Sequence, residues 1–146
     1  MVGGGPAGST TAFYTSKGGL KVLLAEKDNY PKDKICGDMV SPTVHDILQE
    51  MGVLNDFIRE GIGRWITSRG LVSPCGNSFV ADVGKSHDIS VQRYLLDYRM
   101  QLAAQKSGVD CKKLKVLSLT KPSELNGYWT ISCLDENGEE EEYFSR

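Results

Sequence analysis

Apolar and polar residues at the start of the chain follow the order strand, helix, strand. Residues 7–17 are rich in small side chains that suit a helix, and the glycines at 18–19 supply the flexible positions at which helices commonly end. The mostly apolar run 21–26 is typical of a strand buried on both faces of a parallel sheet. Only Met1 and Val2 precede the first glycine, whereas a buried parallel strand ordinarily has about 4–8 apolar residues. The pattern therefore predicts a βαβ unit whose first strand is cut short.

The middle of the chain predicts a second helix and a hairpin. Apolar residues at 44, 47, 48 and 51 recur at helical spacing, and Gly52 follows as a glycine that can end a helix. Between residues 65 and 83, short β-prone runs flank Pro-Cys-Gly-Asn at 74–77, whose backbone preferences favour a turn. We expect an antiparallel hairpin here, which adds a small layer to the parallel sheet.

The last third of the chain resumes the alternation of helix and strand. Residues 92–107 predict a helix that ends at Gly108, and residues 109–117 predict a strand. The helix is expected to bury Leu96, Met100 and Ala103. A second hairpin is expected around the turn at 135–138, because its Asn-Gly pair readily adopts positive φ. Together these elements predict one α/β domain over residues 1–146, with a parallel sheet and a βαβ start.

Composition narrows the class of protein. Hydrophobic residues make up 40% and charged residues 25% of the chain, close to the globular average, so a core can be buried. A formal net charge of −2 and the lack of a dense basic run exclude nucleic acid as an expected partner. No apolar stretch reaches the ~20 residues that cross a bilayer, which leaves peripheral membrane contact open. The default expectation is a cytoplasmic or membrane-peripheral domain of unknown oligomeric state.

The four cysteines lie far apart in the sequence, without the short spacing of zinc sites or redox dithiols. We therefore expect no metal site. Nothing resembles a signal peptide, so an oxidising compartment is unsupported and reduced thiols are expected.

Gly3, Gly5 and Gly8 form the pattern GxGxxG between the first strand and the first helix. In such a motif the glycines allow a tight turn, a close backbone approach to a pyrophosphate and close packing of helix on strand. The helix that begins near Pro6 points its free N–H groups and its positive dipole end at the same place. The turn therefore predicts a dinucleotide phosphate site.

Glu26 ends the second strand about 20 positions after the glycines, where a carboxylate accepts hydrogen bonds from ribose hydroxyls. It would repel a 2′-phosphate, so the expected ligand is FAD or NAD and not an NADP-type adenosine. The alternative is that the glycines only form a turn and Glu26 only ends a strand in an ordinary α/β domain that binds no nucleotide. The fingerprint alone does not separate FAD from NAD, because both present the same adenosine diphosphate.

Three segments in order resemble the geranylgeranyl reductase family of flavoproteins, relatives of the para-hydroxybenzoate hydroxylase-like monooxygenases and flavin halogenases. They are the turn 3–8, the run Tyr-Pro-Lys-Asp-Lys-Ile-Cys-Gly-Asp at 30–38, and Arg-Tyr-Leu-Leu-Asp at 93–97. The resemblance implies a Rossmann-like FAD-binding domain. It also implies that FAD is contacted by Ala7, Glu26, Cys36, Gly37 and Arg93, in addition to the glycines of the turn.

By the same resemblance, the chain is an FAD-dependent oxidoreductase in which reduced FAD delivers hydride to a carbon–carbon double bond of an isoprenoid lipid. NAD(P)H is a candidate external reductant. The alternatives are an aromatic monooxygenase or halogenase acting on another small molecule, and a non-catalytic nucleotide-binding fragment. Family members carry two further FAD-contacting motifs, with Asp-Gly and Gly-Asp, that this sequence lacks. We therefore expect the N-terminal part of a larger flavoprotein, inactive by itself.

Two of these residues keep alternative roles at this stage, and no catalytic residue is assigned. Cys36 either lies near the flavin ring or is buried as a small apolar group. Arg93 either contacts the cofactor or pairs with Asp97 at i,i+4 on a helix surface, a contact of only ~0.2–0.5 kcal/mol.

Overall fold

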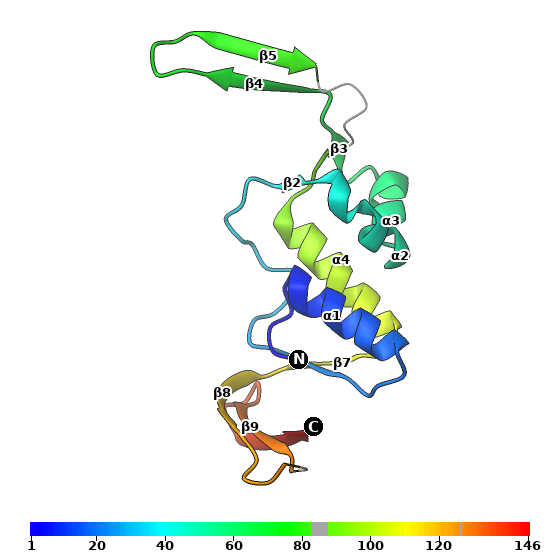
Figure 1. Ribbon diagram of the computed structural model, residues 1–146, viewed down its shortest axis with the longest axis vertical. Coiled ribbons are helices and arrows are strands. Elements are labelled where there is room, and N and C mark those ends of the chain that lie inside the picture. The colour runs from blue at the N-terminus through cyan, green and yellow to red at the C-terminus, as the bar shows by residue number, and fades with distance from the viewer. Residues whose placement is uncertain (83–87, 126) are drawn as a thin grey trace.

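The structure of the chain is a computed structural model that describes residues 1–82, 88–125 and 127–146. Its elements are arranged along one long axis, with a two-stranded hairpin at one end, helices in the middle and a three-stranded sheet at the other end (Figure 1). The helices are α1 Pro6–Lys17, the 3-10 helix η1 Pro42–Val44, α2 His45–Glu50, α3 Val53–Glu60 and α4 Arg93–Lys106. The strands are β1 Leu23–Glu26, β2 Met39–Val40, β3 Arg64–Trp65, β4 Ser68–Val72, β5 Ser78–Asp82, β6 Ile89–Ser90, β7 Asp110–Lys113, β8 Lys115–Thr120, β9 Trp129–Leu134 and β10 Glu140–Ser145.

The predicted βαβ unit is present. Val2 bridges Ala25 in parallel orientation, and β1 pairs in parallel with β7 from Leu23 opposite Asp110 to Glu26 opposite Lys113. The second and third residues of β1, Leu24 and Ala25, are buried, as expected for a strand covered on both faces. Helix α1 connects Val2 to β1 and packs along α4 (Figure 1). The α/β class and the parallel sheet expected from the sequence are therefore confirmed.

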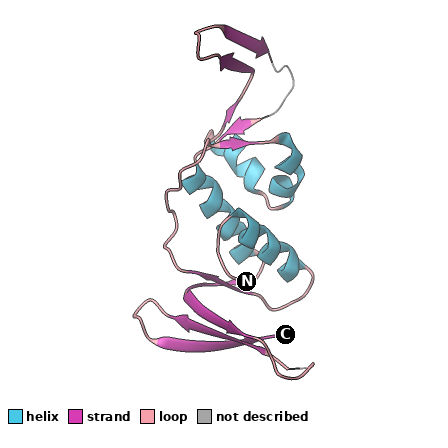
Figure 2. Cartoon of the chain, turned by 60° about the vertical axis from the view of Figure 1, so that its left-hand side comes forward, coloured by secondary structure: helices cyan, strands magenta, loops and turns pink. Residues whose placement is uncertain are grey.

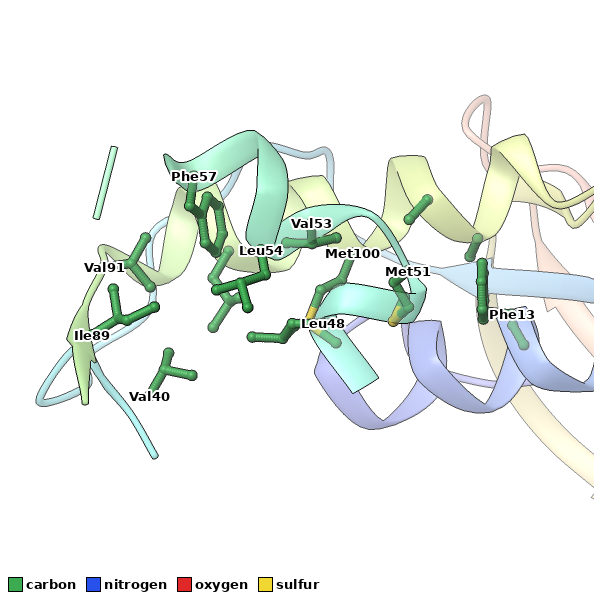
Figure 3. Packing of buried hydrophobic residues seen from close by; sticks show 14 of the residues in the cluster. Phe13, Val40, Leu48, Met51, Val53, Leu54, Phe57, Ile89, Val91 and Met100 are labelled. Carbon is green, nitrogen blue, oxygen red and sulfur yellow. The ribbon is translucent and has the colours of Figure 1, made fainter. Parts of the chain in front are cut away.

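The main core lies between α1, α4 and the short helices α2 and α3 (Figure 3). Helix α4 buries Leu96, Met100 and Ala103, as predicted. Helix α3 was not expected from the sequence. Gly52 adopts φ +77° directly before it, so the glycine that ends the α2 region also turns the chain into a new helix. Helix α3 contributes buried Val53, Leu54 and Phe57 to the core (Figure 3).

The strand predicted at 109–117 is two strands in two sheets, and the prediction of one continuous strand was wrong. Residues 110–113 form β7 beside β1, and residues 115–120 form β8 at the edge of the antiparallel sheet β10–β9–β8. Leu114 lies between them, 3% exposed, and its N–H donates to the Glu26 carbonyl (2.9 Å). It packs with Ala25 and Cys133 in a second small core. The period of apolar residues did not reveal this break, because the chain stays extended through it.

The two predicted hairpins are present. Strands β4 and β5 pair antiparallel, with Leu71 opposite Phe79, and this hairpin projects away from the helices (Figure 2). Val83, the last residue of the predicted hairpin region, lies outside the described residues. Strands β9 and β10 pair around a turn in which Gly138 has φ +84°. None of the helices among the described residues has both the length and the apolar character that a membrane span requires.

Candidate functional site

Two glycines of the turn, Gly3 and Gly8, are needed for its backbone conformation. Gly3 adopts φ +91°, a conformation that L side chains rarely adopt, while its N–H donates to the Ala25 carbonyl (2.8 Å). A Cβ on Gly8 would lie 1.8 Å from the Gly3 carbonyl oxygen, so helix α1 approaches the first strand more closely than any side chain allows. Gly3 and Gly8 are therefore required by the fold itself.

Gly5 differs, because nothing in the described structure requires a glycine there. Its φ of −70° and ψ of −175° are extended values open to any residue, and they suit the residue before a proline. A Cβ at Gly5 would have no neighbour within 4 Å. The space beside Gly5 is therefore open at the N-terminus of α1. A ligand that binds against the backbone would need this open space.

The first turn of α1 begins at Gly5 with Pro6 in the first helical position, and no side chain caps it in the described structure. Pro6 lacks an N–H, so the free donors near the start of the helix are those of the residues that follow, beginning with Ala7. Ser9 instead donates its N–H to the Gly5 carbonyl (2.9 Å). An uncapped helix start with a positive dipole end favours an anion.

Glu26 places its carboxylate directly beside the turn. One oxygen, Oε2, accepts the N–H of Gly4 (2.7 Å), and Oε1 accepts the N–H of Asp28 (3.0 Å). Lys32 donates to the same Oε1 (3.0 Å) and to the Asp28 carboxylate (2.9 Å). Burial alone would raise the pKa of Glu26, but the two N–H groups and the Lys32 ammonium outweigh it and hold the pKa below its ordinary value. Glu26 is thus an ionised, oriented acceptor at the carboxyl end of β1.

A polar cavity of about 260 Å³ opens beside this carboxylate, between the ends of β1 and β7 and helix α4. Glu26, Tyr30, Tyr98 and Gln101 are among its lining residues. The Tyr30 hydroxyl is buried, and the Lys32 ammonium lies 5.0 Å from the centre of the Tyr30 ring. The cavity therefore places an oriented carboxylate beside tyrosine and glutamine side chains.

Cys36 lines a cavity at the start of α1 that differs from the cavity lined by Glu26. Cys36 and Gly37 are exposed, so the interpretation of Cys36 as a buried apolar group was wrong. Asp38 has φ 54°, its carbonyl accepts the Val91 N–H (2.8 Å) and its Oδ1 accepts the N–H of Arg93 (3.2 Å). Asp38 thereby ties this loop to the first residue of α4. Asp38 is not among the residues expected to contact FAD, because a contact across 55 residues leaves no local signal in the sequence.

Arg93 forms the pair with Asp97 that the helix spacing allows. Its Nε donates to Oδ1 (2.7 Å) and its Nη2 to Oδ2 (2.8 Å) of Asp97, whose side chain is 2% exposed. This is a bidentate, partly buried pair and not a loose surface contact. The pairing does not remove Arg93 from the site, because Arg93 also lines a cavity of about 510 Å³ with Ala7 and Cys36.

That larger cavity runs from the start of α1 to α2 and α4, and most of its lining is apolar. Its apolar residues include Val40, Leu48, Leu96 and Met100. The structure thus gathers the predicted residues in two groups: the glycines with Glu26, and Ala7 with Cys36 and Arg93. Gly37 is exposed and has open space at its Cβ position. Lys32, which was not selected from the sequence, completes the first group.

A family model described as an FAD binding domain matches residues 1–115 of the chain. The chain is 37% identical over 144 residues to conditioned medium factor receptor 1 of Dictyostelium discoideum, covering 92% of this chain and 28% of that protein. It is 31% identical over 117 residues to menaquinone reductase of Mycobacterium tuberculosis, covering 74% of this chain and 26% of the relative. It is 29% identical over 128 residues to digeranylgeranylglycerophospholipid reductase of Methanococcus vannielii, covering 85% of this chain and 30% of that reductase. The chain therefore spans under a third of the length of these relatives.

Solved structures share the fold over almost the whole chain. A flavin-dependent brominase superposes with a TM-score of 0.80 at 24% identity, covering 99% of this chain and 35% of the brominase. A geranylgeranyl bacteriochlorophyll reductase-like protein from Thermoplasma acidophilum superposes with a TM-score of 0.76 at 25% identity, covering 99% of this chain and 36% of that protein.

Proposed function

The chain belongs to the FAD binding domain family, and from that premise we propose that it holds the adenosine diphosphate half of FAD in an FAD-dependent oxidoreductase. The observation that carries the proposal is the open space at Gly5. The fold needs Gly3 and Gly8 for its own backbone, but it needs no glycine at position 5. A close approach by a pyrophosphate gives that glycine a physical reason.

In this proposal the start of α1 binds the pyrophosphate. The free N–H groups that begin with Ala7 donate to phosphate oxygens, and the helix dipole adds a favourable field. Gly5 lets the backbone come within contact distance. The proposed contacts of Gly3 and Gly8 are indirect, since both residues shape the turn that aims these N–H groups.

Glu26 is proposed to accept the ribose hydroxyls. Its orientation is set before any ligand arrives, because the Gly4 N–H holds one oxygen and the Asp28 N–H holds the other. Lys32 partly neutralises the carboxylate and lies at the edge of the same site. The polar cavity beside Glu26 is proposed to hold the adenine, with Tyr30, Tyr98 and Gln101 among its lining residues.

Cys36, Gly37 and Arg93 are proposed to contact the part of the cofactor that extends beyond the pyrophosphate. Cys36 and Arg93 line the same cavity as Ala7, so a ligand that leaves the start of α1 in that direction meets both. When bound, FAD supplies hydride and electron transfer at its ring. The protein residues bind and orient it, and the apolar walls of the cavity exclude water.

For the substrate we propose the carbon–carbon double bonds of an isoprenoid chain, with NAD(P)H as the candidate electron donor. The support is the ordered set of three motifs, together with relatives named digeranylgeranylglycerophospholipid reductase and geranylgeranyl diphosphate reductase at 27–29% identity. Contact with a membrane surface would follow from a lipid substrate. An aromatic monooxygenase or halogenase is the second candidate, because such enzymes share this fold with TM-scores of about 0.8.

Titration of the 146-residue chain with FAD, followed by flavin fluorescence, tests the cofactor site. We expect Gly5→Val to weaken FAD binding by at least about tenfold, since the side chain fills the space of the pyrophosphate. Gly70→Val in strand β4 is the matched control, because its Cβ meets only ordinary contacts and it lies in the exposed hairpin. Equal FAD affinity in both variants and the wild type would refute the site.

The substrate is tested separately in the protein that contains this chain at its full length. The flavin is reduced anaerobically, and its reoxidation is followed with a geranylgeranyl compound or with oxygen plus a phenol. Reoxidation by the geranylgeranyl compound, with loss of its double bonds by mass spectrometry, supports the reductase. Oxygen-dependent hydroxylation or halogenation of the phenol alone supports the second candidate.

A further inference from the structure

The carboxylate of Glu26 already accepts three hydrogen bonds from the described part of the chain. The Gly4 N–H donates to Oε2 at 2.7 Å, and the Asp28 N–H and the Lys32 ammonium both donate to Oε1 at 3.0 Å. An ionised carboxylate has about four acceptor positions, two on each oxygen. With these donors in place, Oε1 is fully used and one position, on Oε2, is left for a ligand.

Lys32 is held in place by more than Glu26. Its ammonium also donates to the Asp28 carboxylate at 2.9 Å and lies 5.0 Å from the centre of the Tyr30 ring. Burial alone would lower the pKa of Lys32, but its hydrogen bonds to the two carboxylates outweigh burial and raise the pKa above its ordinary value. Lys32 therefore stays charged at neutral pH and keeps its place on Oε1.

The contacts of Lys32 also place it beside the polar cavity of about 260 Å³. Its three partners, Glu26, Asp28 and Tyr30, all belong to the lining of that cavity. A nucleoside that enters the cavity and reaches the Glu26 carboxylate therefore meets an acceptor that is already shared with an ammonium group.

A ribose presents two neighbouring hydroxyls, at its 2′ and 3′ carbons, whereas Glu26 offers one open acceptor position. We propose that Lys32 is a specificity-determining residue of the ribose site, because it occupies Oε1 of Glu26 and so limits the carboxylate to one of the two hydroxyls. This inference rests on the proposed binding of adenosine diphosphate beside Glu26, and it narrows that contact to a single hydroxyl.

The alternative is that a ribose hydroxyl displaces Lys32 from Oε1, and the surroundings of Lys32 oppose this exchange. An ion pair to a side chain that is 7% exposed would be replaced by a hydrogen bond from a neutral hydroxyl. The remaining carboxylate partner of Lys32 would be Asp28, whose side chain is 46% exposed, so solvent would weaken that attraction. The arrangement with Lys32 on Glu26 is therefore favoured.

The test is the affinity of the 146-residue chain for ADP, 2′-deoxy-ADP and 3′-deoxy-ADP, measured by calorimetric titration. In the wild type we expect one deoxy analogue to bind at least about tenfold more weakly than ADP, because it loses a hydrogen bond to a charged acceptor. The other analogue should bind within about threefold of ADP, since the hydroxyl that it lacks has no acceptor on Glu26.

Lys32→Met removes the ammonium and frees the second position on Oε1. The analogue that matched ADP in the wild type should then bind at least about fivefold more weakly than ADP. Lys34→Met is the matched control, because it makes the same change at an exposed lysine of the same loop, and its affinity ratios should equal those of the wild type. A purely structural role of Lys32 would weaken all three nucleotides alike and leave their ratios unchanged.

The outcomes separate this proposal from the adenosine site on which it rests. No binding of ADP, or equal affinity of the wild type for all three nucleotides, overturns both. Similar losses with the two deoxy analogues in the wild type overturn the role of Lys32 alone, and so do unchanged ratios in Lys32→Met. The wild-type comparison needs no variant, so it decides the proposal even where Lys32→Met does not fold.

Discussion

At the scale of single residues, Glu26 combines two roles that are usually separate. It is a buried carboxylate that helps to hold the glycine turn through Gly4, and it is also the proposed ribose acceptor. A carboxylate with a structural role is oriented before the ligand binds, so little conformational entropy is lost on binding. The same dual role predicts that Glu26 matters for stability as well as for affinity.

The pH dependence of stability tests this role. The pKa of Glu26 lies below its ordinary value, so its stabilising effect is present above the unfolded pKa and is lost as pH falls through the folded pKa. We expect Glu26→Gln to lower Tm most at pH 7, and the difference from wild type to shrink as pH falls below about 4.3, the ordinary pKa of a glutamate. Glu136→Gln, at an exposed turn, is the control. A Tm difference that stays constant down to pH 3 would contradict the linkage.

At the scale of elements, helix α3 shows how a short amphipathic segment is stabilised by packing. Phe57 is 2% exposed and lies in the core with Val53 and Leu54, while the next residue, Ile58, is 58% exposed (Figure 3). An isolated helix of eight residues would be marginal in water, so its buried face holds it in place.

Two neighbouring truncations separate the faces of α3. Phe57→Ala should reduce the free energy of unfolding by about 3–5 kcal/mol, because a large buried side chain is lost and a cavity remains. Ile58→Ala should change it by no more than about 0.5 kcal/mol. Urea unfolding of both variants decides the matter, and similar losses in the two would show that α3 does not pack as described.

The β4–β5 hairpin is the opposite case, an element without a buried face. Leu71, Val72, Phe79 and Val80 are each at least 66% exposed. A two-stranded hairpin with both faces in solvent is at best marginally stable. Its apolar side chains and open edges also make it a site for association.

Shortening the hairpin is therefore expected to cost little stability. Replacing residues 71–79 by Asn-Gly keeps Arg69, which pairs with the buried Asp88, and leaves Gly70 opposite Val80. We expect Tm to change by less than about 2 °C, measured by circular dichroism, and solubility to rise. A fall in Tm of several times that size would mean that the hairpin packs on the rest of the chain in solution.

At the scale of the whole molecule, the polar groups of the proposed FAD site gather around Glu26 and the glycine turn. The glycine turn, Glu26 and the polar cavity surround the place proposed for adenosine diphosphate, whereas the cavity beyond it is mostly apolar. If the proposed site is right, most of the specific hydrogen bonds that these residues can offer would go to one half of FAD.

This division predicts the relative affinities of the chain for ADP and FAD. In calorimetric titrations the 146-residue chain should bind ADP and FAD with affinities within about tenfold of each other, or ~1.4 kcal/mol. AMP, which lacks the pyrophosphate, is the control and should bind more weakly than both. FAD binding a hundredfold tighter than ADP would show that Cys36, Gly37 and Arg93 carry a large share of the affinity.

Features that depend on residues close together in the chain could be predicted without the structure. The βαβ unit follows from a local apolar pattern, and the shape of the turn follows from Gly3 and Gly8, because only glycine fits a positive φ or a helix so near the strand. Glu26, the last residue of β1, could be selected for the same reason. Its spacing from the glycines is fixed by one helix and one turn.

Contacts between distant segments could be known only from the fold. Asp38 meets the start of α4 across 55 residues, and Leu114 turns the chain from one sheet into another by packing against Ala25 and Cys133. Even the Arg93–Asp97 pair, which helical spacing suggests, could be recognised as a buried pair at a cavity wall only from the fold. Local patterns fix conformation, but burial and the approach of charges depend on which segments the fold brings together.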